Sequence, residues 1–277
     1  MAIEQFKGKQ VLVTGAAAGI GRATALAFAR CGANLVITDV NPARLAGVQR
    51  EIEALGASCL AHAADVSDEG AMKQFADAVH ARVGAVDVLV NNAGIGYLGP
   101  FLESPLDSWR RVLDINVLGV VHGCYFFLPK MLAGGGTRQV VNIASLAGVA
   151  PAPNMTAYAA SKHAVMGLSD VLRMELDGTT VGVTAVCPGI INTEITAAGR
   201  NVSPAVSSAQ LGKLQAYYRE HGCSPDVVAE AIVDAVRAGR TILLVGPYAR
   251  LMYHLKRISR QLVHALTLSD AQKNGFA

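Results

Sequence analysis

Seven short runs rich in Val, Ile and Leu alternate along this chain with longer segments that have the spacing of helices. The apolar runs lie at residues 10–14, 34–39, 58–63, 86–91, 139–144, 181–187 and 241–245, and the helical segments lie near 20–31, 42–55, 69–83, 105–133, 156–177 and 225–238. Strands that alternate with helices in this way form a parallel sheet with helices on both faces. The pattern therefore predicts a doubly wound α/β fold with a seven-stranded parallel sheet.

Length and composition agree with one large domain. Hydrophobic residues make up 52% of the 277 residues and charged residues 16%, as expected when parallel strands are buried on both faces. No linker, repeat or low-complexity segment divides the chain. We predict one domain over residues 1–246, in which a long loop at 190–222 lines the ligand crevice, and an amphipathic, basic C-terminal extension over 247–277.

Charge and residue types disfavour several functional classes. The net charge of +3 is too small to indicate nucleic-acid binding. The N-terminus has no apolar signal region, and the five cysteines are scattered, so we expect a cytoplasmic protein with reduced thiols. The longest uncharged run, 139–161, contains Asn, Ser and Pro and does not read as a membrane span. The seven histidines show no ligand spacing, so no metal is expected.

The first strand runs directly into the sequence TGAAAGIG at residues 14–21. Glycine at Gly15, Gly19 and Gly21 allows a tight turn and lets a pyrophosphate approach the start of the following helix, with Ile20 beside it. Asp39 ends the second strand, where a carboxylate accepts hydrogen bonds from ribose hydroxyls and repels a 2′-phosphate. The motif predicts NAD as the cofactor, although glycines of ordinary turns and a helix-capping aspartate are the simpler alternatives.

Four polar residues suggest proton-transfer chemistry. Tyr158 and Lys162 are four apart in a helical segment and share one face, so the ammonium can favour the phenolate of the tyrosine. Ser145 follows the fifth strand, where its hydroxyl can hold a substrate oxygen near Tyr158. Asn116 is an amide within an apolar helix and needs a partner there. The alternative is a surface Tyr–Lys pair with a serine that serves only a turn.

These motifs resemble the short-chain dehydrogenases/reductases over residues 6–246. The matching segments are TGAAAGIG at 14–21, Asp65-Val66, NNAG at 91–94, Asn116, Ser145, YAASK at 158–162 and PGIINT at 188–193. The resemblance implies a Rossmann fold with strand order 3-2-1-4-5-6-7. It implies that Asn116 holds a water on a proton path from Lys162, and that Tyr158 and Lys162 also contact the cofactor. It further implies cofactor contacts by Asp65 and Val66 at adenine, by Asn92, Ala93 and Gly94 along the cofactor, and by Pro188, Gly189, Ile191 and Thr193 at the nicotinamide.

We therefore predict an oxidoreductase that transfers a hydride between NAD(H) and a hydrophobic secondary alcohol or ketone, with Tyr158 as general acid and base. The apolar substrate is suggested by Ile195, Leu211, Leu214, Tyr217 and Tyr218 in the long loop. The alternatives are an NADP-dependent carbonyl reductase, a non-catalytic cofactor-binding sensor or scaffold, and a membrane-surface protein. The resemblance also implies a homodimer or homotetramer that pairs through helices 105–133 and 156–177.

The C-terminal extension departs from the family, whose chains usually end soon after the last strand. Its apolar residues follow helical spacing at Leu251, Leu255, Ile258, Leu262 and Leu266. Its basic residues are Arg250, Lys256, Arg257 and Arg260. We predict an amphipathic helix over 246–266 that packs on its own domain or a dimer mate, covers the substrate, or lies on an anionic membrane.

Overall fold

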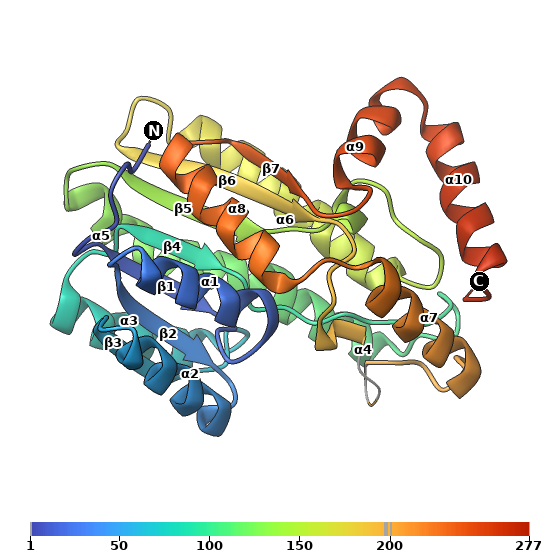
Figure 1. The fold of residues 1–277 in the computed structure, drawn as a ribbon, viewed down its shortest axis with the longest axis horizontal. Helices are drawn as coiled ribbons and strands as arrows, with labels where there is room; N and C mark the ends of the chain where they lie inside the picture. The colour runs from blue at the N-terminus through green and yellow to red at the C-terminus, as the bar shows by residue number, and fades with distance from the viewer. Residues whose placement is uncertain (1, 197–198, 200, 277) are drawn as a thin grey trace.

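The computed structural model describes residues 2–196, 199 and 201–276, so residues 197, 198 and 200 of the predicted loop and residue 277 of the extension lie outside the described residues. A single seven-stranded sheet organises the chain (Figure 1). Its strands are β1 (Gln10–Thr14), β2 (Asn34–Asp39), β3 (Cys59–Ala63), β4 (Val88–Asn91), β5 (Arg138–Ile143), β6 (Val181–Pro188) and β7 (Ile242–Val245). Each neighbouring pair is parallel and the order is β3-β2-β1-β4-β5-β6-β7, which confirms the predicted fold and strand order.

Helices cover both faces of this sheet. Those that pack on the sheet are α1 (Gly19–Arg30), α2 (Pro42–Ala54), α3 (Glu69–Val83), α5 (Gly119–Ala133), α6 (Thr156–Glu175) and α8 (Pro225–Ala238). The other described α-helices are α4 (Leu106–Leu113), α7 (Ser208–His221), α9 (Ala249–Ile258) and α10 (Arg260–Lys273). Alternate residues of a strand point to opposite faces. Val11 and Val13 accordingly pack with α1, α2 and α8, whereas Leu12 packs with α3, α5 and α6. The two apolar layers fix the sheet, and the carboxyl ends of its strands lie at one edge.

Several helices begin where the residue types favour a cap. Asp68 accepts a hydrogen bond from the backbone N–H of Ala71 at the start of α3, and Asn41 does the same for α2. Proline follows the cap in both α2 and α8, where its missing N–H costs no helical hydrogen bond. These local signals explain why the predicted starts of these helices lie close to the observed ones.

The segment predicted as one helix at 105–133 has an irregular centre. A π-helical stretch, η1 (Asp114–Leu118), joins α4 to α5 and contains Asn116. Among the described residues, Leu106–Ala133 is the one helical run that is long and apolar enough to cross a membrane, with a mean hydropathy of 1.5. It is a core helix in this fold, because Phe127 and Met131 of α5 are buried against the sheet.

The loop expected at 190–222 contains a helix that the sequence pattern did not predict. α7 occupies its second half and starts at a capping box, in which Ser207 accepts from the backbone of Gln210 and Gln210 accepts from the backbone of Ser207. A short 3₁₀ turn, η3 (Glu194–Thr196), lies in its first half. The wall of the crevice formed by residues 190–222 therefore includes a capped helix and is not made of irregular loop alone.

The predicted single helix over 246–266 is wrong, because two helices form there. Ser259 adopts an extended backbone with φ −150° and ψ 113°, and its side chain accepts a hydrogen bond from the N–H of Leu262. A serine that caps α10 thus ends α9. The expected apolar stripe does not form a buried face, since 83% of Ile258 and 46% of Leu262 remain exposed.

Candidate active site

A pocket of about 810 Å³ lies at the carboxyl edge of the sheet, where ligands bind in folds of this topology. The predicted site residues that line it are Gly15, Gly19, Ile20, Asp39, Asp65, Val66, Asn92, Ala93, Gly94, Ser145, Tyr158, Lys162, Pro188, Gly189, Ile191 and Thr193. Gly21 and Asn116, which were also predicted, do not line it. The sequence motifs, which are spread over 179 positions from Gly15 to Thr193, therefore converge on one cavity.

The glycines at the start of α1 form a cradle that no side chain could share. Gly15 has a φ of +62°, and a Cβ on it would lie 2.7 Å from the Cα of Ala93. A Cβ on Gly21 would lie 2.1 Å from the carbonyl oxygen of Gly15. No side chain caps α1 and no acidic residue lies in its first turn. The N–H groups there are thus available for an anionic group such as a pyrophosphate.

Behind the cradle, a clamp joins β1 to the end of β4. The hydroxyl oxygen of Thr14 accepts hydrogen bonds from the N–H groups of Asn92 and Ala93, both at 3.0 Å. The side-chain amide of Asn92 donates to the carbonyl oxygens of Thr14 at 2.9 Å and Gly15 at 3.1 Å. Thr14 was not among the predicted site residues, although it opens the glycine motif. The clamp holds the cradle in place before any ligand binds.

Asp39 lies at the end of β2 and faces the same part of the pocket. Its carboxylate accepts hydrogen bonds from the N–H groups of Ala17 at 3.1 Å and Asn41 at 2.9 Å. Arg44 lies close by and pairs with Glu194 at 2.8 Å. The pKa of Arg44 is raised, chiefly by its hydrogen bond to Glu194, and the charge of Asp39 adds to the effect. Arg44 is a cation near Asp39 that the sequence pattern did not single out.

Tyr158 and Lys162 lie together on α6, and both are buried. The ammonium nitrogen of Lys162 is 5.8 Å from the centre of the Tyr158 ring and donates to the carbonyl oxygen of Ile143 at 2.9 Å. Ser145 follows β5 and caps the short 3₁₀ turn η2 (Leu146–Gly148) through the N–H of Ala147. A phenol, an ammonium and a hydroxyl therefore meet at the wall of the pocket.

Burial controls the protonation of this group. It raises the pKa of Tyr158, and a hydrogen bond with Ser145 opposes that shift. Burial also lowers the pKa of Lys162 to about 8. The neighbouring ammonium was expected to lower the pKa of Tyr158, but the pKa is raised. The reason is that Lys162 donates its hydrogen bond to Ile143, so the loss of hydration of the phenol dominates. Tyr158 is thus a neutral phenol at neutral pH in this structure.

Asn116 is fully buried behind the pocket, in the π-helical stretch. Its amide oxygen accepts from the N–H of Ile95 at 2.8 Å, and its nitrogen donates to the carbonyl of Ile95 at 2.9 Å and to the hydroxyl of Ser161 at 3.0 Å. A Cβ on Gly94 would lie 3.2 Å from the Asn116 oxygen and 3.4 Å from the Lys162 nitrogen. Asn116 therefore fixes the loop after β4 next to Lys162. π-helical turns recur at functional sites.

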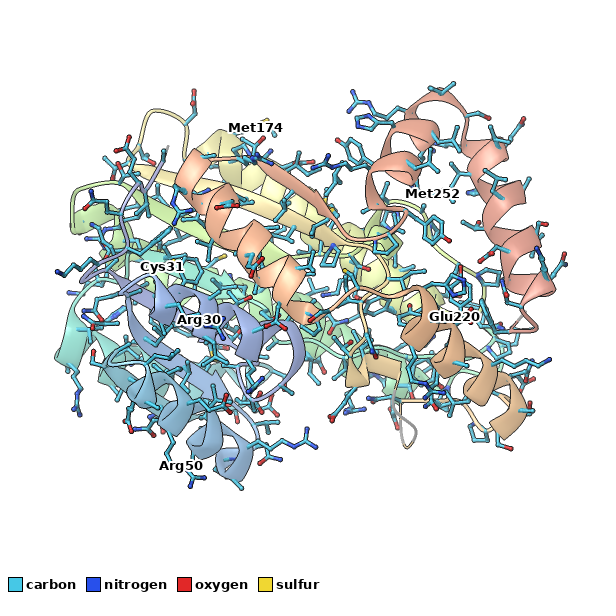
Figure 2. All side chains as sticks on the ribbon, in the orientation of Figure 1. Arg30, Cys31, Arg50, Met174, Glu220 and Met252 are labelled. Carbon is cyan, nitrogen blue, oxygen red and sulfur yellow. The ribbon has the colours of Figure 1, made fainter. Side chains whose placement is uncertain are left out.

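The outer part of the pocket is formed by α7 and the C-terminal extension. Ile195, Leu214, Tyr217 and Tyr218 line it as the sequence suggested, and Leu211 does not. Leu251 and Met252 of α9 and Leu266, Asp270 and Phe276 at or beyond α10 complete the wall. Figure 2 shows the side chains of this region, with Met252 marked on α9 and Glu220 on α7.

Three contacts tie the extension to the pocket. The hydroxyl of Tyr217 donates to the carboxylate of Asp270 at 3.2 Å, and its ring packs against Phe276 with centroids 5.4 Å apart. The side-chain amide of Asn154 donates to the carbonyl oxygen of Phe276 at 3.0 Å. Asp270, Phe276 and Asn154 were not predicted, because no motif connects these distant positions in the sequence.

The pKa shifts predict how the rate depends on pH. If Tyr158 accepts the proton of an alcohol, as the sequence predicts, its raised pKa means that the rate of oxidation should rise about tenfold per pH unit below about pH 8. The rise should flatten near pH 8, where Lys162 loses the charge that stabilises the phenolate. Ketone reduction needs the phenol, which persists at every pH below the raised pKa of Tyr158, so its rate should stay nearly constant over the same range. The measurement is kcat/KM against pH in both directions, and a flat oxidation profile would contradict this assignment.

Comparisons with known proteins place the chain among related sequences. A family model described as short chain dehydrogenase matches residues 9–202. The protein EphD of Mycobacterium tuberculosis, described as an oxidoreductase, is 40% identical over 264 residues; the match covers 94% of this chain and 45% of EphD. SadH of the same species, also described as an oxidoreductase, is 38% identical over 98% of both chains. A cyclohexanol dehydrogenase of an Acinetobacter species is 36% identical over 70% of this chain and 77% of that protein.

Solved structures agree in fold and differ in the cofactor they contain. A short-chain dehydrogenase/reductase of Burkholderia phymatum in complex with NAD superposes with a TM-score of 0.86 and 34% identity, covering 94% of this chain and 96% of that one. A metagenomic short-chain oxidoreductase in complex with NADP gives a TM-score of 0.71 and 31% identity, covering 87% and 97%. The chain thus shares its fold with proteins that hold either dinucleotide.

Proposed function

This chain belongs to the short-chain dehydrogenase/reductase family, and we propose that it is an oxidoreductase that transfers a hydride between NAD(H) and a hydrophobic secondary alcohol or ketone. The observation that carries this proposal is the meeting of Tyr158, Lys162 and Ser145 at the wall of one pocket whose other end is the glycine cradle. A scaffold without catalysis would have no physical need to bury an ammonium beside a phenol, since burial destabilises the charge.

The residues of the inner pocket fit a dinucleotide. The cradle of Gly15, Gly19 and Gly21 would hold the pyrophosphate, and Asp39 would accept hydrogen bonds from the adenosine ribose. Asp65 and Val66 would lie at the adenine, and the residues from Pro188 to Thr193 at the nicotinamide. A nicotinamide bound there supplies the site of hydride transfer.

The proton is handled by side chains of this protein. In oxidation, Tyr158 would take the proton of the substrate hydroxyl, and in reduction its phenol would return one to the substrate oxygen. Ser145 would donate a hydrogen bond that holds the substrate oxygen at the tyrosine. Lys162 would stabilise the phenolate by its charge and bond the ribose of the cofactor, for which it must leave its present partner, the carbonyl of Ile143.

The walls of the outer pocket favour an apolar substrate. Leu214, Leu251, Met252 and Leu266 face it, and the substrate oxygen needs only the polar groups at its base. The name of the Acinetobacter relative, a cyclohexanol dehydrogenase, supports an alcohol of this class for the present chain. The exposed apolar residues Tyr125 of α5 and Val171 and Met174 of α6 support self-association through these helices. Met174 is labelled in Figure 2.

The test is a panel of ketones and secondary alcohols of graded size, with NADH absorbance as the readout and NADPH run in parallel. We expect kcat/KM to increase by about threefold to fourfold for each added methylene until the pocket is filled, because burial of each contributes about 0.8 kcal/mol. Charged analogues of the same size serve as controls and should react poorly. Absence of turnover across the panel, or a preference for the charged analogues, would contradict the proposal.

A further inference from the structure

The C-terminal extension stands out from the body of the protein as a pair of helices joined by a bend (Figure 1). The bend falls at Ser259. In α10 the least exposed residues are Val263, Thr267 and Ala271, which are four apart. The residues immediately before and after each of them are exposed. We call residues 250–262 the basic elbow. Its tip lies away from the sheet (Figure 1), so packing on the sheet does not account for the exposed residues there.

Positive charge gathers on the elbow without compensation. Arg250, Lys256, Arg257 and Arg260 lie in it, and no Asp or Glu occurs between Asp234 and Asp270. Within the described part of the chain, none of these four cations forms an ion pair. Lys256 instead donates to the carbonyl oxygen of Val149, which anchors α9 at the base of the elbow.

Large apolar side chains share the exposed face with these cations. Leu251 is 61% exposed and Ile258 is 83% exposed. Along α9, Leu251 and Ile258 are seven residues apart, as are Arg250 and Arg257, so the two pairs form adjacent stripes on one side of the helix. Leu262 continues the exposed apolar surface into α10. A helix face with Leu and Ile beside Arg has the composition of helices that lie at a membrane surface.

We propose that the basic elbow docks on the surface of an anionic lipid bilayer. Each cation near such a surface gains about 1 kcal/mol from the negative potential, and the apolar residues gain more by entering the headgroup region. A second copy of the chain fits this surface less well. A twofold interface places the same patch against itself, which would bring arginines of the two copies together with no carboxylate between them.

The elbow also adjoins the mouth of the pocket. Leu251 is exposed on the elbow and lines the pocket, and Leu266, which is 42% exposed, does the same from α10. Docking would therefore place the outer pocket next to the bilayer, where an apolar substrate is concentrated. This inference goes beyond the proposed function, since docking does not require that the enzyme be active.

The experiment is sedimentation of the full chain with two kinds of vesicle, phosphatidylcholine mixed with phosphatidylglycerol and phosphatidylcholine alone. We expect binding to the anionic vesicles at low salt, little binding to the neutral ones, and release at high salt. Arg257→Glu changes the charge by two units and should weaken binding roughly 30-fold, since each unit contributes about fivefold. Ile258→Ser should weaken it roughly tenfold, because it removes an apolar side chain that would enter the headgroup region on docking.

Matched controls use exposed residues outside the elbow. Arg50→Glu makes the same charge change on α2 (Figure 2), and Leu102→Ser removes an apolar side chain that is 88% exposed. Both should bind vesicles as the unchanged protein does, and all four variants should keep its thermal midpoint. If Arg257→Glu proves unstable, Arg260→Glu makes the same charge change on the elbow and serves as the test in its place.

Two results would overturn the proposal. One is equal sedimentation with both kinds of vesicle, or with neither. The other is a change in molecular mass by analytical ultracentrifugation for Arg257→Glu or Ile258→Ser with unchanged vesicle binding, which would make the elbow a contact between subunits.

Discussion

Tyr158→Phe is expected to lower kcat at least ~100-fold, the usual scale for loss of a general acid and base, while NADH binding stays nearly unchanged. Tyr158 is 7% exposed at the wall of the pocket, and phenylalanine keeps the shape of its ring and removes only the hydroxyl. The protein loses the group that exchanges a proton with the substrate oxygen. Turnover with a good substrate and NADH binding by fluorescence measure the two effects separately.

Tyr218→Phe is the matched control. Tyr218 lines the same pocket from α7, and burial raises its pKa to about 12, with a further contribution from the charge of Tyr158. The phenol of Tyr218 is therefore buried in the same pocket and is affected by the charge of Tyr158. If Tyr158 carries the proton, Tyr218→Phe should change KM more than kcat. Equal losses of kcat in the two variants, or near-normal kcat in Tyr158→Phe, would refute the assignment.

Asp39→Ala is expected to lower kcat/KM for NADH roughly 10- to 100-fold, the value of hydrogen bonds to a charged group, and to raise it for NADPH. The unchanged protein should prefer NADH, because the Asp39 carboxylate would repel a 2′-phosphate in a partly buried site. Arg44 lies on the same side, but Glu194 pairs with it at 2.8 Å, so its charge is already matched. The measurement is kcat/KM for both cofactors.

Asp39→Asn separates the two parts of this effect. The amide keeps the shape of the side chain and an acceptor for the ribose, but removes the negative charge. It should therefore raise activity with NADPH while costing less with NADH than the alanine does. A preference for NADPH in the unchanged protein would mean that Arg44 determines the cofactor. Replacing Glu194 by Gln would then raise activity with NADPH further.

The fold could be predicted because each strand carries its own signal. A buried parallel strand reads as an unbroken apolar run, and the segments between these runs keep helical spacing. The order of motifs then determined the strand order through the family resemblance. α7 was missed even though Ser207 and Gln210 form a readable capping box, because the apolar residues of this helix line a pocket and give little periodicity.

The inner site was readable where glycine or a reacting group must occupy a set position. At Gly21, for example, a Cβ would lie 2.1 Å from the carbonyl oxygen of Gly15, so only glycine fits there. The presence of glycine at this position therefore indicates the local structure. Residues that act through long-range contacts had no such signal. Arg44 meets Glu194 across 150 positions, and Asn154 meets Phe276 across 122. Such pairs form only in the folded chain. Ser259 likewise has no distinctive sequence context, and only its extended backbone shows that it separates α9 from α10.

The π-helical turn at Asn116 changes the phase of the long helix that contains it. A π turn holds about one residue more than an α turn, which rotates everything after it by roughly 100° relative to an uninterrupted helix. Before the turn, Val112 packs with Tyr97 and Ala157 beside the pocket; after it, Cys124 and Phe127 pack with the sheet and α3. Because of this one extra residue, α4 can pack beside the ligand cavity while α5, in the same continuous helix, packs on the core through a different side. Deletion of any residue between 114 and 118 would bring the two halves back into phase and turn one of these faces away from its partner.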